Sequence, residues 1–407
     1  MIRLVEAWFI ELAKGAGKLF LNPLLYWAII LILFSGIRRI KRERNNFGTK
    51  VFGLFAEWKH TWLVSLFSGL IVSIVCLAGG MVFSYETIFL VSVVSIIISI
   101  ALRFTYLSPS YTIGFTFLLL LFIPALRAQE FDVNLNAELF STTNFSGLAV
   151  LLGVLLIVES VMVKRVQQND SFPELEMGKR GKWVGQHRLK KASIIPFFVL
   201  VPSGAITSFV SYWPSISLGG DTYSLLLVPF LLGFEHVIKG STPNQTKKKL
   251  AVSIGTLGAV VLILALVSVL FPWVSLATVI IAIFGSEFIR YKHRVHDNAS
   301  IPYFNREGKG LKVLAVIPGT PAARLDVLAG ETIQKVNGKR VNQLADFYQA
   351  LQTSGAYFKM EVIDESGEIR FVQSAFYQGD HHELGILFTK EKYRQKSKTH
   401  GRMNQEA

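Results

Sequence analysis

Long apolar stretches fill most of residues 19–289, and the chain then becomes polar and rich in predicted strands. A helix needs roughly 20 mostly apolar residues to cross the hydrocarbon of a bilayer. Most of this chain is therefore predicted to fold within a membrane. Five stretches reach that length with few charges and are predicted spans: Leu19–Ile37, Trp62–Phe83, Thr87–Leu107, Phe145–Val163 and Leu250–Phe271.

Four further apolar stretches are shorter: Tyr111–Leu126, Ile194–Val210, Tyr223–Ile238 and Trp273–Ile289. Segments of about 15 residues either cross the membrane, re-enter it or lie within a helical bundle. Counting all of them, residues 19–290 form a multi-span region with about nine crossings, or about eight as the alternative. Residues 1–18 precede this region as an amphipathic segment.

Composition supports a membrane protein. The chain is 51% hydrophobic and only 17% charged, with a mean hydropathy of +0.43, which excludes an ordinary soluble enzyme. Its one cysteine, Cys76, lies inside a predicted span, so the chain contains neither an intrachain disulfide nor a cysteine-based metal cluster.

The formal net charge of +14 is concentrated in particular loops. Basic residues crowd into 38–59, 164–191, 239–249 and Arg290–Arg294, whereas the loops at 127–144 and 213–222 are acidic or lack basic residues. The positive-inside rule places the basic loops and the C-terminal tail in the cytoplasm. Nine crossings leave the N-terminus outside, whereas a re-entrant first segment leaves it in the cytoplasm.

Acidic residues recur near the cytoplasmic ends of the predicted spans, at Glu159, Glu235 and Glu287. Ionisable groups at this depth suggest either an ion path or a polar joint between helices. The alternative is interfacial ion pairing, of Glu159 with Lys164 and Arg165, or of Glu287 with Arg290. The polar loop 167–191 is expected to lie along the membrane surface or to bind a partner.

From Gly310 onward the pattern predicts a small α/β domain. A strand at 311–317 leads to a helix capped by Thr320, and an Asn337-Gly338 turn joins two short strands. Asn342 is predicted to cap a helix with Leu344, Phe347 and Leu351 on one face. Strands at 358–363 and 368–374, and a last run at 384–388, complete the sheet.

This region resembles the PDZ domains, especially those of bacterial proteins. The resemblance rests on Val316-Ile-Pro-Gly-Thr-Pro-Ala-Ala323, on Leu328-Ala-Gly-Glu-Thr-Ile333 and on Val336-Asn-Gly338. The expected fold is an α-helical polytopic membrane bundle followed by a cytoplasmic α/β PDZ domain at 301–390. A polar tail at 391–407 is predicted to be disordered.

The resemblance implies peptide binding by strand addition, with the peptide carboxylate held by backbone amides of a glycine-containing loop. Glu383-Leu384-Gly385-Ile386 is the best candidate for that loop, and its place after the last hairpin implies a permuted strand order. The groove then lies between Leu384–Phe388 and the helix at 343–351. Leu344 and Tyr348 either face the ligand or pack in the core. The predicted peptide-binding residues are Glu383, Leu384, Gly385, Ile386, Leu387, Phe388, Leu344, Tyr348 and Leu351.

Catalytic motifs are not found. His382-Glu383-Leu-Gly385 lacks the second histidine of a zinc protease helix, and the chain has neither a Gly-x-Ser-x-Gly elbow nor a phosphate-binding loop. We therefore expect no enzyme activity, no metal and no cofactor. A membrane transporter, or a PDZ-regulated membrane protein of another pathway, is the alternative. Several prolines could interrupt helices, but no repeat is evident.

As a whole, the chain resembles the polytopic membrane PDZ adaptors of the Min division-site selection system in Gram-positive bacteria. Asn22–Tyr26, Gly36–Arg44 and Leu107–Tyr111 add to this resemblance. It implies a non-catalytic adaptor that bridges the polar and septal scaffold DivIVA to the division inhibitor MinD. Such an adaptor prevents division near poles or completed septa, is enriched at both places, contacts other division proteins and the lipid bilayer, and binds no nucleic acid.

Overall fold

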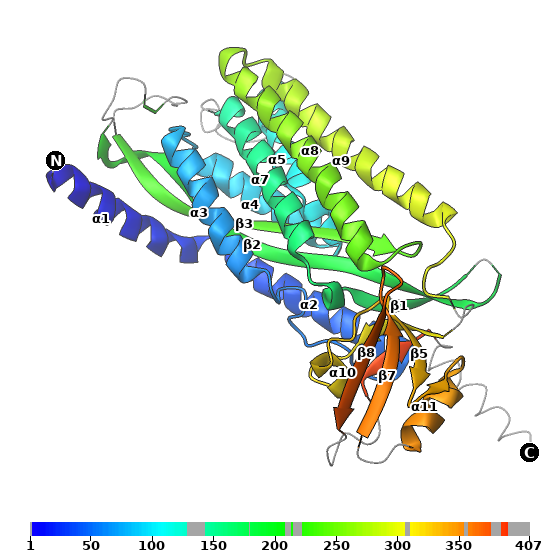
Figure 1. Cartoon of the computed structure of the whole chain (residues 1–407). Coiled ribbons are helices and arrows are strands. Elements are labelled where there is room, and N and C mark those ends of the chain that lie inside the picture. Colours follow the sequence, from blue (N-terminus) through cyan, green and yellow to red (C-terminus); the bar gives the residue numbers. More distant parts are fainter. Residues whose placement is uncertain are drawn as a thin grey trace, which may run out of the picture.

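The computed structural model describes residues 2–127, 143–178, 180–207, 213–214, 222–305, 310–353, 357–375 and 384–389. It shows a helical part built around one long β-hairpin, with a small α/β domain at one end (Figure 1). Glu383, the predicted disordered tail at 391–407 and most of the acidic loop 127–144 lie outside the described residues.

The helical part contains α1 (Ile2–Lys18), α2 (Pro23–Phe47), α3 (Trp62–Ala78), α4 (Tyr85–Ser99), α5 (Pro109–Arg127), α7 (Phe145–Arg165), α8 (Pro243–Leu270) and α9 (Val274–Ala299). Within the described residues, α2, α7, α8 and α9 are long and apolar enough to cross a membrane, and α3, α4 and the described part of α5 are shorter apolar helices. The expectation of a helical membrane region is thus confirmed.

Two of the four shorter apolar stretches are not helices. The described part of Ile194–Val210 falls on strand β2 (Trp183–Thr207) and Tyr223–Ile238 falls on β3 (Thr222–Ile238), and the two strands pair antiparallel as one hairpin. A continuous apolar run fits a buried strand as well as a helix. Here the prolines favour the strand, because Pro196 lies opposite Pro229 and each would remove a hydrogen bond from a helix interior.

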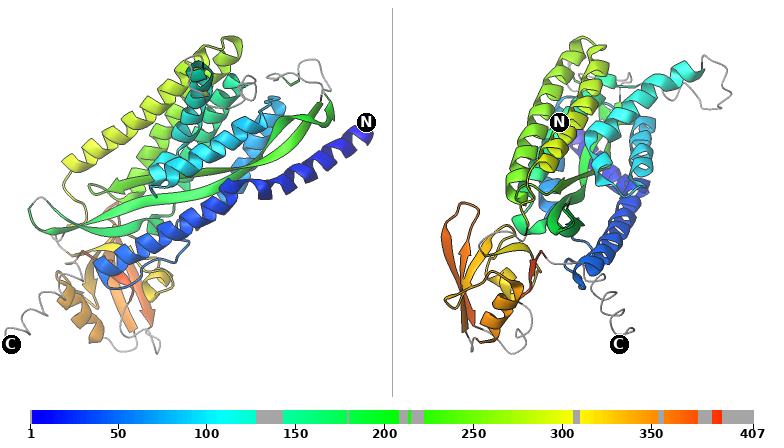
Figure 2. Two further views of the ribbon diagram at one scale, coloured as in Figure 1. Left: turned by 180° about the vertical axis from the view of Figure 1, so that it is seen from behind. Right: turned by 90° about the vertical axis from the view of Figure 1, so that its right-hand side faces the viewer.

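Helices cover both edges of the hairpin. On the β2 edge, the Phe198 N–H donates to Ser73 Oγ of α3 at 2.9 Å, and Gly69 of α3 lies against the Pro196 carbonyl so closely that a Cβ would clash. On the β3 edge, Glu11 of α1 accepts a hydrogen bond from Ser224 Oγ. Open strand edges are costly in lipid because their backbone groups lack partners, so these helices make the hairpin compatible with a membrane (Figure 2).

The polar loop 167–191, expected to lie along the membrane surface or to bind a partner, is ordered against the rest of the chain over most of its described residues. It contains η3 (Gln168–Asp170), β1 (Phe172–Met177) and the start of β2, with which β1 pairs. Asn169 accepts a hydrogen bond from the Ala329 N–H at 2.9 Å and donates one to the Val327 carbonyl at 3.0 Å. The partner of this loop is therefore the C-terminal domain of the same chain.

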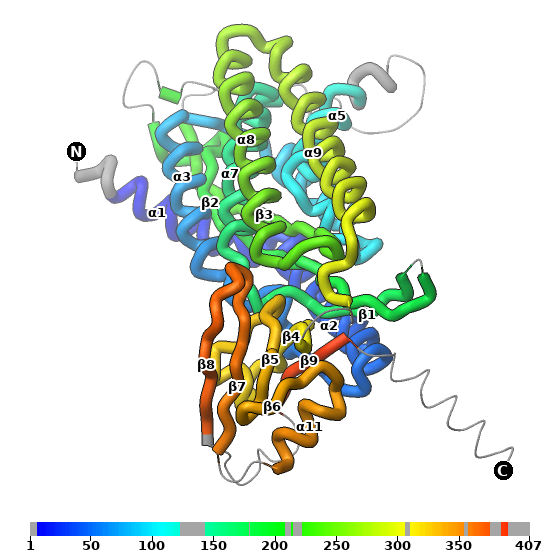
Figure 3. The backbone as a smooth tube through the Cα atoms, turned by 45° about the vertical axis from the view of Figure 1, so that its right-hand side comes forward, coloured from blue at the N-terminus to red at the C-terminus, as the bar shows by residue number. Residues whose placement is uncertain are grey.

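The C-terminal domain contains β4 (Leu311–Val316), α10 (Pro321–Arg324), β5 (Thr332–Val336), β6 (Lys339–Arg340), α11 (Leu344–Gln352), β7 (Tyr357–Ile363), β8 (Ile369–Ala375) and β9 (Ile386–Phe388). Its main path of strands runs β8-β7-β5-β4-β9, so the last strand in sequence pairs with the first (Figure 3). This order confirms the expected permutation.

Neighbouring residues of β9 face two different cores. Ile386 and Phe388 belong to the core of the C-terminal domain, whereas Leu387 packs with Phe52 and Phe172 of the membrane part. The Gly185 N–H also donates to the Phe304 carbonyl at 2.9 Å in the connection to the domain. The outer face of this part of the sheet is therefore fixed against the membrane region.

Candidate peptide-binding site

Strand β9 and helix α11 are the two elements that sequence analysis predicted as the borders of a peptide groove. β9 pairs antiparallel with β4, with Phe388 opposite Val313 and Ile386 opposite Val316. No strand pairs with its other side within the part of the chain that the structure describes. An unpaired edge is what strand addition requires, because the incoming peptide supplies the missing partner.

The loop before β9 has the backbone of a tight turn. Gly385 has φ +80°, a conformation that residues with a Cβ adopt only at a cost, and a Cβ there would clash with Thr320. The Leu384 and Gly385 carbonyls accept hydrogen bonds from the Ala322 and Ile317 N–H groups at 3.0 and 2.8 Å. The loop is thus held against the start of α10, a contact that sequence analysis did not identify.

The predicted groove residues of α11 differ in exposure. Leu344 and Leu351 are partly buried and pack against the core of the domain. For Leu344 this matches the alternative that it packs in the core instead of facing a ligand. The Tyr348 side chain is 39% exposed, and its ring packs edge to face on Phe347 with the centroids 5.6 Å apart. Among the predicted residues that the structure describes, Tyr348 is therefore the most accessible to a ligand.

The cap of α11 also differs from the prediction. Gln343 rather than Asn342 is the N-cap, and Asp346 accepts a hydrogen bond from the Gln343 N–H at 3.0 Å in a capping box. Asn342 Oδ1 instead accepts a hydrogen bond from the Gly310 N–H. The helix consequently begins at Leu344, one residue later than expected for an Asn342 cap.

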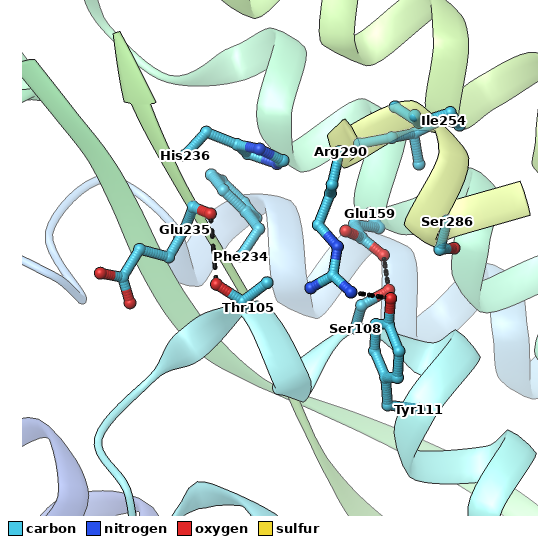
Figure 4. A pocket seen from close by; sticks show the side chains of 11 residues that line it. Thr105, Ser108, Tyr111, Glu159, Phe234, Glu235, His236, Ile254, Ser286 and Arg290 are labelled. Carbon is cyan, nitrogen blue, oxygen red and sulfur yellow. Dashed lines mark hydrogen bonds between the residues drawn. The ribbon is translucent and has the colours of Figure 1, made fainter. Parts of the chain in front are cut away.

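A second cluster of polar side chains lies in the membrane part (Figure 4). Glu159 accepts a hydrogen bond from Ser108 Oγ at 2.6 Å rather than pairing with Lys164 or Arg165, so that predicted pairing is wrong. Arg290 pairs with Glu287, as expected, and also donates to the Tyr111 hydroxyl. The pocket between these residues has a volume of about 20 Å³, which is room for about one water molecule. This size fits a polar joint between helices better than an ion path.

Comparison with known proteins finds relatives for the PDZ domain and for the chain as a whole. A family model described as PDZ domain matches residues 312–363, which run from β4 to β7. The Bacillus subtilis protein "Cell division topological determinant MinJ" is 36% identical over 384 residues, covering 94% of this chain and 96% of that protein. The chain belongs to the MinJ family. Proteins called "Probable cell division topological determinant MinJ" in Lacticaseibacillus paracasei and Lacticaseibacillus casei are each 23% identical, over 92% of this chain and 98% of theirs.

The MinJ similarity extends well beyond the PDZ domain. It covers almost the whole chain, and therefore includes the helices, the long hairpin and the docked domain. It thereby confirms the resemblance that Asn22–Tyr26, Gly36–Arg44 and Leu107–Tyr111 suggested for the membrane part.

Proposed function

We propose that this protein is a non-catalytic membrane adaptor in division-site selection. In this proposal it binds a DivIVA-like scaffold and a MinD-like ATPase, together with other division proteins, and is enriched at the septum and the poles. Its relatives are named as topological determinants of cell division, and the presence of a PDZ domain on a chain with membrane-spanning helices supports a role in positioning proteins.

The observation that carries the proposal is the position of β9. One side of this strand has no partner strand among the described residues, and the side chain of Leu387 is buried against the membrane part. A peptide that adds to the free edge is consequently held at the membrane by a domain that is itself fixed there. Tethering of this kind raises the local concentration of a partner without any reaction.

The single peptide groove of the docked PDZ domain also explains why an adaptor with two partners needs a second binding surface. The groove accepts one chain terminus, so a second protein must use other cytoplasmic surfaces of the same molecule. Two contacts on one membrane-bound molecule favour joint recruitment, because the second contact becomes intramolecular once the first has formed.

The proposal is tested by imaging and co-purification of the full-length protein. Fluorescent wild-type protein is expected at division septa and poles, and to co-purify with DivIVA-like and MinD-like proteins of its host. Tyr348→Glu is expected to lose at least one of these contacts, with Tyr357→Glu on β7 as the control. An even distribution of the wild type around the membrane, with neither protein co-purifying, rejects the adaptor.

A further inference from the structure

A second, much larger cavity lies at the predicted cytoplasmic end of the membrane part. Its volume is about 850 Å³, and it is bordered by α2, by the connection that follows α4, by the sheet of β1 to β3 and by α9. Nine lysine and arginine side chains line it, against four carboxylates. A cavity with this excess of positive charge attracts anions.

Most of these basic side chains already have a carboxylate partner. Six of the nine form ion pairs, as Arg188 does with both Glu174 and Glu235. The carboxylate of Asp297 accepts hydrogen bonds from the backbone N–H groups of Lys239 and Gly240. The paired groups stabilise the walls of the cavity and contribute little free positive charge.

Three arginines remain. Among the described residues, Arg38, Arg103 and Arg294 have no ion-pair partner, and all three are exposed. They come from three different elements, namely α2, the connection after α4 and the last turns of α9. Guanidinium groups bind phosphate through paired N–H donors, and arginines from separate elements can approach one phosphate from several directions.

Exposed apolar side chains close in sequence to the three arginines favour a lipid as the carrier of the phosphate group. Ile37 precedes Arg38 and is 56% exposed, Ile100 stands three residues before Arg103 and is 60% exposed, and Tyr291 stands three residues before Arg294 and is 66% exposed. Acyl chains would cover these side chains, whereas a water-soluble phosphate would leave them bare. Basic pockets between membrane helices on the cytoplasmic side are suited to anionic lipid headgroups.

We propose that this cavity binds the phosphate headgroup of an anionic phospholipid through Arg38, Arg103 and Arg294. The volume is sufficient for a headgroup, since pockets for small molecules typically measure about 300–1,000 Å³. This inference is separate from the peptide groove, because α2, α9 and the connection after α4 lie outside the PDZ domain.

The test uses full-length protein purified in detergent and titrated with phosphatidylglycerol, with bound lipid measured by native mass spectrometry. The double variant Arg103→Gln/Arg294→Gln is expected to bind this lipid about 30-fold more weakly. Lys248→Gln/Lys249→Gln, which removes two exposed charges of α8 outside the cavity, is expected to bind like the wild type. Arg103→Lys/Arg294→Lys keeps the two charges but loses the paired N–H donors, and should recover part of the affinity, which a folding defect would not allow.

Three results would overturn the proposal. The first is equal affinity of the wild type and Arg103→Gln/Arg294→Gln for phosphatidylglycerol. The second is equal affinity of the wild type for phosphatidylcholine, which lacks net charge. The third is displacement of bound phosphatidylglycerol by millimolar inorganic phosphate, which would assign the cavity to a soluble anion instead.

Discussion

The Phe347 ring of α11 packs edge to face on the Phe388 ring of β9, with the centroids 5.2 Å apart and the planes at 70°. Both side chains are buried in the core of the PDZ domain. Aromatic pairs in this geometry are favourable beyond the area that they bury. This contact inside the core therefore joins α11 to β9, the two elements predicted to border the peptide groove.

Tyr348→Glu is expected to weaken peptide binding about tenfold, because it removes an aromatic contact and places a negative charge near the peptide carboxylate. The measurement is fluorescence anisotropy with a labelled peptide that ends in an apolar residue and a free carboxylate. Tyr357, which is 51% exposed on β7, provides the matched control Tyr357→Glu. Equal affinity of both variants, or unchanged affinity for the amidated peptide, would contradict the groove.

Gly385→Ala is expected to destabilise the PDZ domain by at least about 1 kcal/mol more than Gly319→Ala. Both glycines have positive φ, at +80° and +83°, so both variants include the backbone cost. Only at Gly385 does the added Cβ clash with Thr320, because the space around Gly319 is open. Thermal unfolding of the two variants in detergent measures the difference, and equal midpoints would mean that Thr320 moves away freely.

Ser73→Ala is expected to lower the stability of the membrane part by about 1–3 kcal/mol, since it leaves the Phe198 N–H without its acceptor in an apolar environment. Ser253→Ala is the control. Ser253 Oγ is half-buried and donates to the Lys249 carbonyl within its own helix, and no backbone N–H depends on it, so its loss should have little effect. Thermal unfolding at one detergent concentration compares them; similar midpoints would show that α3 does not support the hairpin edge.

We expect the contact between the membrane part and the PDZ domain to be sensitive to pH because of His187. Its ring is fully buried, hydrogen-bonds to Ser171 through Nδ1 and packs on Phe304 with the ring centroids 4.8 Å apart. Burial lowers the pKa of His187 from 6.5 to about 4. The folded state therefore holds a neutral ring at pH values where the unfolded chain is already protonated.

The stability contributed by His187 is fully present above pH 6.5 and is lost as the pH falls toward 4, by about 3 kcal/mol at pH 4. His187→Phe removes this titration. We expect the stability difference between the wild type and His187→Phe to change in favour of the variant between pH 7 and pH 4. Thermal unfolding across this range checks it, and a difference that does not vary with pH would place the titration elsewhere.

The PDZ fold could be predicted because its turns and helix starts are marked by particular residues at those positions. Gly385, Asn337 and Gly338 all have positive φ, which asparagine and glycine tolerate best, and Thr320 precedes the helix that begins at Pro321. The peptide-binding role of the predicted residues remains a prediction. The Gln343 cap was missed because asparagine is the stronger cap by residue type, whereas Asn342 Oδ1 accepts a hydrogen bond from the Gly310 N–H, a group distant in sequence.

The hairpin could not be predicted in the same way. The residues of β2 and β3 are apolar over long runs, and this apolar pattern alone does not distinguish a helix from a strand that is covered on all sides. Pro196 and Pro229 were the one local signal against a helix. The distinction depends on partners far away in sequence, such as Ser73 with Phe198 and Glu11 with Ser224. Gly69 and Ser73, which lie four residues apart on one helix face, were the available signal for a close contact.

The division of this protein into a membrane part and a PDZ domain is readable from the sequence, because helix length, charge in loops and turn residues are local properties. Only the folded chain establishes which apolar segments are strands, how Asn169 attaches the PDZ domain to the membrane part, and which arginines remain unpaired. Each of these depends on groups that meet only after folding, since a hydrogen bond or an ion pair needs a partner within about 3–4 Å.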